Sequence, residues 1–159
     1  MDLKEKKWWL YVEKDIRSLF VEAFSLMEFA KESDQDFGDY AFIVFPAAKG
    51  YEGLLKKVFL DLGFITKEDF FGKRFRIGKA LNPSLEKAFR HESVYDRLVD
   101  YCNGKEVADK LWKTWKLCRN LVFHWFPNEK NSLDLDEAKD RLEMILSAID
   151  SLFLECKIN

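Results

Sequence analysis

Apolar residues recur at helical spacing along most of the chain. Near the N-terminus they make one stripe, which predicts a first helix over about residues 3–31. The polar, turn-forming residues 32–38 end this helix. The members of the stripe are Trp9, Val12, Ile16, Leu19, Ala23, Met27 and Ala30.

A second helical region is predicted over about residues 39–62. Its opening, residues 40–45, also fits a buried strand when taken locally. Helical spacing returns after Pro46, a residue that can open a helix or kink one. We therefore expect a kinked or two-part helix, with Gly63 at the position of a C-terminal glycine.

The middle of the chain has a weaker pattern. Residues 64–81 are expected to be irregular and contain a basic run broken by apolar residues. Asn82, as N-cap, and Pro83 then predict a third helix that pauses near Ser93 and continues to Tyr101. The Asn-Gly pair at 103–104 is a clear break.

Two further helices complete the prediction. A fourth is expected over about residues 105–125, stopped by Pro127. A fifth begins at Asp134, with Glu137 placed for a capping box, and runs to about Glu155. The pattern predicts an all-α, four- to five-helix bundle in a single domain over residues 1–159. The core stripe of the fourth helix is Val107, Leu111, Trp115, Cys118 and Val122.

Charge narrows the possible functions. The net charge is −2, with charges of both signs making up 34% of the chain, so binding of nucleic acid by bulk positive charge is not expected. A local basic patch remains possible. The aromatic content of 16% suits a thick helical core or an apolar interface.

The three cysteines and the lengths of the apolar runs indicate in which cellular compartment the protein resides. An odd number of cysteines without a C-x-x-C pair supports neither a disulfide framework nor a zinc ribbon. We expect three reduced, mostly buried thiols, as in a cytosolic protein. No signal peptide and no apolar stretch long enough to span a membrane is visible, so the sequence predicts a cytoplasmic protein.

The candidate chemistry lies in residues 119–124. The chain has two histidines, and His91, among polar residues, is expected at the surface. His124 follows Arg119 by five positions. A histidine can move protons near neutral pH, and an arginine can hold a phosphate and its developing charge. Together these groups are a minimal set for cleaving RNA without a metal.

On a straight helix, Arg119 and His124 would point in different directions. A spacing of five residues separates two side chains by roughly 140° around an ideal helix, so they do not share a face. The spacing alone favours a partly buried helix-end role for His124 and a solvated role for Arg119. An irregular helix end near Pro127, or a second subunit across a two-fold axis, would bring the groups together.

Residues 119–124, Arg-Asn-Leu-Val-Phe-His, resemble the R-x-x-x-x-H signature of HEPN domains, helical domains common in bacterial ribonucleases. Asn120, directly after the arginine, also fits that signature. Residues 45–57 resemble the helix that carries a lysine and a glutamate in the RNase LS-like branch of the family. The resemblance spans roughly residues 39–153.

This resemblance implies a HEPN-type toxin that cleaves mRNA, acts as a homodimer and is silenced by a protein antitoxin. It implies catalytic roles for Arg119, His124 and Asn120, with Glu52 as an accessory active-site carboxylate. Well-known toxins of this branch carry extra domains, so this chain would be a stand-alone version. Another HEPN branch has a tyrosine two residues after the histidine as the target of a nucleotidyltransferase. Phe126 stands there and has no hydroxyl to accept AMP.

Other candidate residues have two interpretations each. Lys49 could bind RNA and Glu52 could assist catalysis, or the two could form a solvated pair on a helix face. In the catalytic interpretation, a carboxylate beside a histidine would raise the pKa of the histidine and orient its ring. The run Lys73-Arg74-Phe75-Arg76 could grip phosphates while its phenyl ring stacks on a base, or be a charged surface loop. The tryptophans 112, 115 and 125 favour the core or a dimer interface over an RNA platform.

The leading hypothesis is a metal-independent endoribonuclease that needs no cofactor. The sequence contains no convincing metal site, because it has neither a His/Cys cluster nor a tight set of carboxylates. The alternative is a catalytically silent HEPN-like module that binds RNA or a protein. A plain helical assembly domain is a third possibility.

Overall fold

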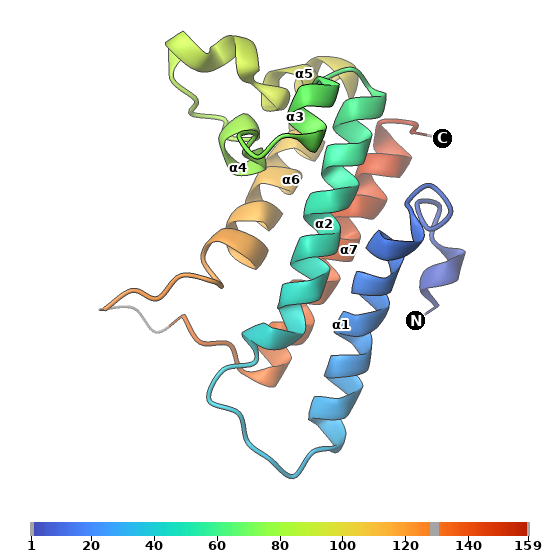
Figure 1. The fold of residues 1–159 in the computed structure, drawn as a ribbon, viewed down its shortest axis with the longest axis vertical. Coiled ribbons are helices and arrows are strands. Elements are labelled where there is room, and N and C mark those ends of the chain that lie inside the picture. Colours follow the sequence, from blue (N-terminus) through green and yellow to red (C-terminus); the bar gives the residue numbers. More distant parts are fainter. Residues whose placement is uncertain (1, 128–130, 159) are drawn as a thin grey trace.

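A computed structural model describes residues 2–127 and 131–158 of the chain and shows an all-α fold. Three long helices lie side by side along the molecule: α1 (Lys14–Glu32), α2 (Ala41–Asp61) and α7 (Leu135–Glu155) (Figure 1). A fourth helix, α6 (Glu106–Trp115), packs on α7. The shorter elements gather at one end of the bundle: α3 (Lys67–Phe71), α4 (Ile77–Ala80), the 3₁₀ helix η2 (Lys87–Glu92) and α5 (Val94–Tyr101).

The core lies between α1, α2, α6 and α7, where apolar stripes face one another. The helices α1 and α2 approach closely because Gly50 has no side chain: a Cβ there would come within 3.1 Å of the Phe20 ring. At the N-terminus of α7, Asp134 and Glu137 form the predicted capping box. The fifth predicted helix is therefore confirmed, at both of its expected ends.

The prediction for the N-terminus was wrong in one respect. The first long helix begins at Lys14, and residues 3–5 form only a short 3₁₀ helix, η1 (Leu3–Glu5). The intervening segment is held by α7, because the indole of Trp8 donates a hydrogen bond to Asp150 at 3.0 Å. Trp8 is fully buried there. This tertiary contact outweighs the local helical spacing.

The second predicted helix is one element, with Pro46 inside it. The alternative of a strand at residues 40–45 is wrong, and the helix is not divided in two. Pro46 is the sixth residue of this helix, so its missing N–H removes the hydrogen bond to the carbonyl oxygen of Phe42, and the helix nevertheless continues to Asp61. Gly63 follows the C-cap with φ +69°, a left-handed conformation that favours glycine, so this prediction is confirmed.

The stretch between α2 and α6 is more ordered than predicted. Thr66 and Asp69 form a capping box that starts α3, inside the segment expected to be irregular. The predicted third helix does not start at Asn82: η2 and α5 are separate, and Ser93 is the N-cap of α5. The Asn82 side chain instead accepts a hydrogen bond from the backbone of Ser84 at 2.9 Å.

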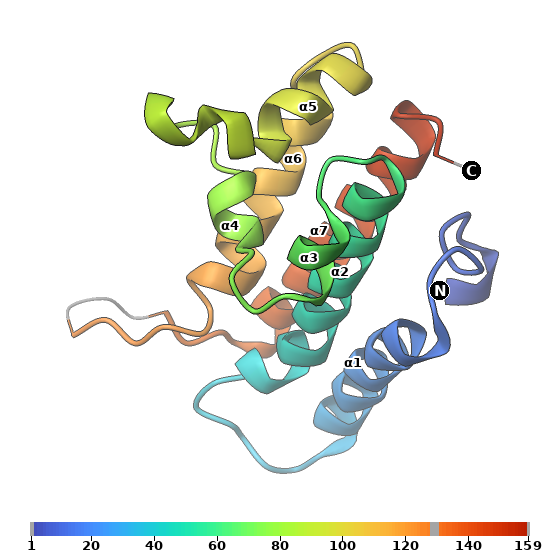
Figure 2. The same cartoon turned by 45° about the horizontal axis from the view of Figure 1, so that its top comes forward.

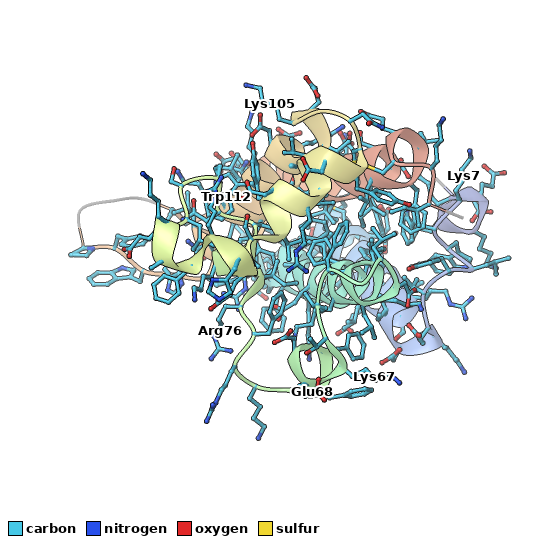
Figure 3. The ribbon with its side chains drawn as sticks, turned by 90° about the horizontal axis from the view of Figure 1, so that it is seen from above. Lys7, Lys67, Glu68, Arg76, Lys105 and Trp112 are labelled. Carbon is cyan, nitrogen blue, oxygen red and sulfur yellow. A yellow bond between two sulfur atoms is a disulfide. The ribbon has the colours of Figure 1, made fainter. Side chains whose placement is uncertain are left out.

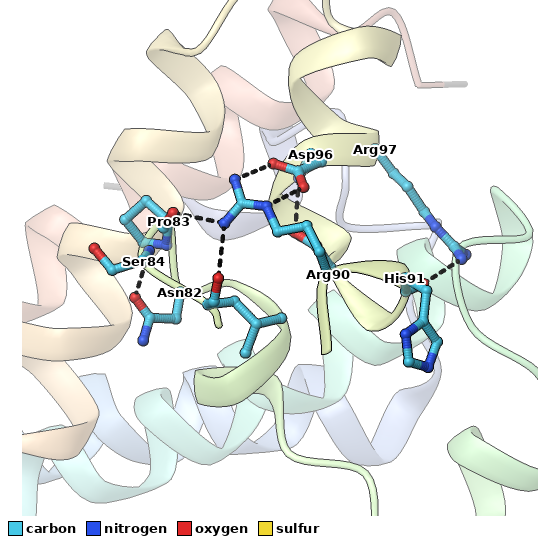
Figure 4. Close-up of polar contacts among 9 residues, drawn as sticks. Asn82, Pro83, Ser84, Arg90, His91, Asp96 and Arg97 are labelled. Atoms are coloured by element: carbon cyan, nitrogen blue, oxygen red, sulfur yellow. Dashed lines mark hydrogen bonds and ion pairs between the residues drawn. The ribbon is translucent and has the colours of Figure 1, made fainter. Parts of the chain in front are cut away.

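Arg90 holds this stretch together, as Figure 4 shows. Its guanidinium makes an ion pair with Asp96 on α5 at 2.6 Å and donates to the carbonyl oxygen of Pro83 at 2.8 Å. The loop before η2 is thereby tied to α5. His91 lies nearby with its side chain exposed, as predicted.

The cysteine prediction was wrong. Cys102 and Cys156 form a disulfide between the C-terminal ends of α5 and α7, with their Cα atoms 4.7 Å apart. Cys118 is free and buried, as expected. The pairing depends on two helix ends meeting in space, which cysteine number and spacing do not reveal. None of the helices formed by residues 2–127 and 131–158 combines the length and the apolar character that a membrane span requires.

Candidate active site

The segment that carries Arg119 departs from a regular α-helix. After Trp115 the chain forms one π-helical turn, η3 (Lys116–Asn120), in which the N–H of Leu121 donates to the carbonyl oxygen of Lys116 at 3.0 Å. Residues 121–123 form a turn, and His124 lies beyond the helix. The prediction of a helix to residue 125 was therefore wrong, although its core stripe is buried as expected. Single π turns are frequent at functional sites.

This irregular end removes the geometric objection to the pair. An angle of roughly 140° between two side chains applies only when both lie on one straight helix. Arg119 lies on the π turn, whereas His124 lies on a segment that turns away from the helix axis. Figure 2 shows the chain leaving α6 and passing the first turns of α2 before it enters α7.

Asn131 fastens this segment after the turn. Its side-chain amide donates to the carbonyl oxygen of Leu121 at 3.0 Å and to the carbonyl oxygen of His124. Two backbone groups that a helix would have satisfied are thus bonded by one side chain. The arrangement fixes the backbone at both ends of residues 121–124.

Helix α2 supplies the opposite wall. Phe45, Lys49 and Glu52 lie on one face of α2 because they are spaced three or four residues apart. Buried Tyr51 links α2 to α6, since its hydroxyl donates to the carbonyl oxygen of Leu111 at 3.2 Å. Burial raises the pKa of Tyr51 well above its usual value, so this donor keeps its proton.

A small pocket of about 330 Å³ forms between these walls, and we refer to it as the Arg–His pocket. Glu52 Oε2 lies 4.0 Å from Arg119 Nε, an ion-pair distance longer than a hydrogen bond. The Arg119 guanidinium also lies 5.4 Å from the centre of the Trp115 ring. The lining residues are Phe45, Ala48, Lys49, Glu52, Arg119, Phe123 and His124.

The groups in this pocket remain open to a ligand. Both charged partners are partly exposed, Arg119 at 41% and Glu52 at 35% of the side chain. Among the described residues, none accepts a hydrogen bond from the Arg119 guanidinium, so its donors can reach an incoming oxyanion. His124 is exposed, with its ring 6.2 Å from that of Phe126. Phe123 packs edge-on against Phe45 at 5.4 Å and closes one side.

A larger cavity of about 720 Å³ adjoins the Arg–His pocket, and we refer to it as the basic cavity. The two share Glu52 and Arg119. Three elements line the basic cavity: α2, the segment of residues 72–79 and the α6–η3 helix. Figure 3 labels Arg76 and Trp112 from the last two of these. The lining includes Asn120, Lys73 and Arg76.

The structure brings most of the sequence candidates together. Lys49, Glu52, Arg119 and His124 line the Arg–His pocket, and Asn120 lines the basic cavity. Glu52 pairs with the arginine, whereas the sequence argument set it beside the histidine. Arg74 lines neither of these two: it lines a third pocket, of about 380 Å³, which shares Phe75, Arg76 and Lys79 with the basic cavity.

Two residues that border the site were missed by the sequence argument. Lys56 lies one helical turn after Glu52 on α2 and lines the basic cavity, so i,i+4 spacing could have indicated it. Asn131 had no such signal, because its hydrogen bonds reach across a turn whose path the sequence does not give.

Within the described residues, no group of three or more His, Cys, Asp or Glu side chains is arranged to hold a metal ion. Comparisons of the chain with known protein families, with curated proteins and with solved structures found no match.

Proposed function

We propose that this protein is a metal-independent endoribonuclease whose active centre is the Arg–His pocket. The observation that carries the proposal is the meeting of Arg119, His124 and Glu52 at one pocket within a single chain. A proton-transfer group, a fixed cation and a positioning carboxylate are the groups that cleavage of a phosphodiester needs. Lys49 adds a second cation at the rim.

The reaction follows from these groups. The ribose 2′-hydroxyl loses its proton to a base, and its oxygen forms a bond to the adjacent phosphorus. The bond from phosphorus to the 5′-oxygen of the next nucleotide breaks, and that oxygen takes up a proton. The products are a 2′,3′-cyclic phosphate and a 5′-hydroxyl. His124 moves one of these protons and solvent water moves the other, and Arg119 neutralises the extra charge of the pentacoordinate phosphorus.

Glu52 acts through the arginine. At 4.0 Å it aligns the guanidinium without saturating its donors. Asn120 lies just outside the Arg–His pocket, on the wall of the basic cavity, where it can bond the sugar or phosphate of a neighbouring nucleotide.

The biological role that we propose is the toxin of a toxin–antitoxin pair, with mRNA as substrate. Support comes from the HEPN-like Arg-Asn-Leu-Val-Phe-His segment, which supplies the arginine and histidine of the pocket. A toxin of this kind needs a protein antitoxin. Covering the Arg–His pocket would exclude RNA, so the rim of this pocket is the expected contact.

We also propose a homodimer. Three large aromatic side chains beside the pocket are exposed: Trp125 at 82%, Phe45 at 54% and Phe126 at 37%. Apolar rings in this number at one place are typical of a protein interface. A two-fold contact would use the same patch on both chains and set two Arg–His pockets near each other. Sedimentation at micromolar concentration tests this assembly.

Expression in a bacterial host tests the function. The wild-type chain is expected to arrest growth, whereas His124→Ala and Arg119→Ala are expected to be harmless at the same protein level. Lys113→Ala serves as the matched control, because Lys113 is exposed on α6 and lines neither the Arg–His pocket nor the basic cavity. It should remain as toxic as the wild type.

Equal toxicity of all four proteins would exclude cleavage by this pair. Binding of RNA by the wild type and both pocket variants, without cleavage by any of them, would identify a silent binding module instead.

A further inference from the structure

The basic cavity has an imbalance of charge that points to an anionic ligand. Its wall contains five cationic side chains and one carboxylate, that of Glu52, in a protein of net charge −2. Two of these cations are already paired, Lys79 with Glu92 at 2.7 Å and Arg119 with Glu52 at 4.0 Å. The remaining three are Lys56, Lys73 and Arg76, and among the described residues none of them forms an ion pair. The Arg76 guanidinium donates to the backbone carbonyl oxygens of Lys73 and Phe75.

The same cavity has an aromatic wall. Trp112 of α6 and Phe75 of the loop before α4 both line it, and both are half-buried. Trp115 lies behind and is buried, held by α4: a Cβ at Gly78 would come within 2.6 Å of its indole nitrogen. Part of the surface of each half-buried ring is therefore available to a ligand within reach of the free cations.

Anionic and aromatic recognition occur together in sites for single-stranded nucleic acid. Cations follow the phosphates, and exposed rings stack on unpaired bases of any identity. The bases of a duplex are stacked on one another and cannot reach such a ring. A volume of about 720 Å³ is within the range of ordinary ligand sites.

We propose that the basic cavity binds the unpaired nucleotide next to the cleaved bond. Its base stacks on Trp112 and Phe75, and its phosphates lie against Lys56, Lys73 and Arg76. The shared wall of Glu52 and Arg119 makes the path continuous from the scissile phosphate to this nucleotide. This inference rests on the proposed function and sets the substrate class as single-stranded RNA.

The test measures binding in a catalytically disabled background. Fluorescence anisotropy of a labelled, unstructured RNA oligonucleotide gives the Kd for His124→Ala protein, whose mutated side chain is exposed. Adding Trp112→Ala should raise the Kd by about 5- to 100-fold, the size of one lost base–aromatic stack. Trp112→Phe, which keeps a ring, should stay within about threefold of the parent. Thermal unfolding of each variant confirms that the proteins compared are folded.

Charge is tested separately, through the salt dependence. Lys56→Ala or Arg76→Ala should reduce the slope of log K against log salt by about 0.7, the value for one lost phosphate contact on a single strand. Lys113→Ala on the outer side of α6 is the matched control and should leave the slope unchanged. Unlabelled single-stranded RNA should compete with the labelled oligonucleotide, and the same sequence as a duplex should not.

The outcomes separate the two proposals. A Kd that is the same with Trp112→Ala, or equal competition by the duplex, would overturn the nucleotide site even if the wild type cleaves RNA. Binding that depends on Trp112 and Arg76, in a protein whose wild type never cleaves RNA, would uphold the site and overturn the proposed nuclease.

Discussion

The three long helices and the segment between α2 and α7 differ in what they contribute: the helices form most of the core, and the segment supplies many of the site residues. Helices α1, α2 and α7 have 19, 21 and 21 residues, and most apolar positions of α2 and α7 are buried. The intervening segment is built from elements of ten residues or fewer. Its charged and titratable site residues include Arg119, His124, Lys73 and Arg76, whereas those of the long helices are Lys49, Glu52 and Lys56.

The difference has a physical cause. A long regular helix places neighbouring side chains at fixed angles, which suits a packed core but limits how many groups can converge on one point. Short elements with turns between them can direct side chains from several directions toward a pocket. Substitutions at buried positions of the long helices should therefore change stability, and substitutions of the side chains that line the site should change activity.

The largest expected difference is between the effects of Phe20→Ala and His124→Ala on the free energy of unfolding. Phe20 is fully buried between α1 and α2, so Phe20→Ala should lower the free energy of unfolding by about 3–5 kcal/mol, the usual cost of removing a buried ring. His124→Ala should change it by less than about 0.5 kcal/mol, because that side chain is exposed. Urea unfolding measures both values. A His124→Ala protein as unstable as Phe20→Ala would show that the site also supports the fold.

The disulfide joins α7 to the segment between α2 and α7, and its removal should have the next largest effect on the free energy of unfolding. Cys102 and Cys156 are 54 residues apart, so their bond restricts the unfolded chain over a long loop. Replacing both by serine should lower the free energy of unfolding by about 3–4 kcal/mol. RNA cleavage by the folded variant should persist, because the bond lies at the helix ends away from the Arg–His pocket. Loss of cleavage in a variant that remains folded would show that the bond positions the site.

A smaller loss of stability is expected from a substitution where α4 packs on α6. A Cβ at Gly78 would come within 2.6 Å of the Trp115 indole nitrogen, so Gly78→Ala must shift one of the two. Overpacking of this kind lowers the free energy of unfolding by about 1–3 kcal/mol. Gly38→Ala is the matched control, since nothing lies within 4 Å of a Cβ there. Equal stability of the two variants would show that the α4 segment moves freely.

The smallest expected effect depends on pH. Burial raises the pKa of the Cys118 thiol to about 12, from 9.0. The folded protein therefore holds this proton more tightly than the unfolded chain, so the contribution to stability is complete below pH 9 and is lost as the pH rises through 12. Between pH 8 and 10 the loss from this group is on the order of 1 kcal/mol. The free energy of unfolding of Cys118→Ala should fall less than that of the wild type between pH 8 and 10. An identical fall in the two proteins would exclude the Cys118 thiol as the cause.

The long elements could be predicted from the sequence because their signals are local. The capping box at Asp134, the left-handed glycine at 63 and the buried stripe of α6 each depend on residues within a few positions of one another. The start of α1 could not be predicted, because Trp8 is held by Asp150 from the other end of the chain.

The candidate site shows the same division. Arg119, His124 and Glu52 could be selected by residue type and by resemblance, but their convergence could not. It depends on the π turn of residues 116–120 and on the hydrogen bonds of Asn131. The disulfide was missed for a related reason, since the ends of α5 and α7 meet only in the folded chain.

The central claim is that Arg119 and His124 cleave RNA without a metal, and one assay tests it directly. Purified wild-type protein and His124→Ala are incubated with unstructured RNA in excess EDTA, and the ends of the fragments are identified. The account predicts cleavage by the wild type, with 2′,3′-cyclic phosphate or 3′-phosphate and 5′-hydroxyl ends, and a rate about 100- to 10,000-fold lower for His124→Ala. Cleavage only with added Mg²⁺ or Mn²⁺, or an unchanged rate for His124→Ala, would contradict it.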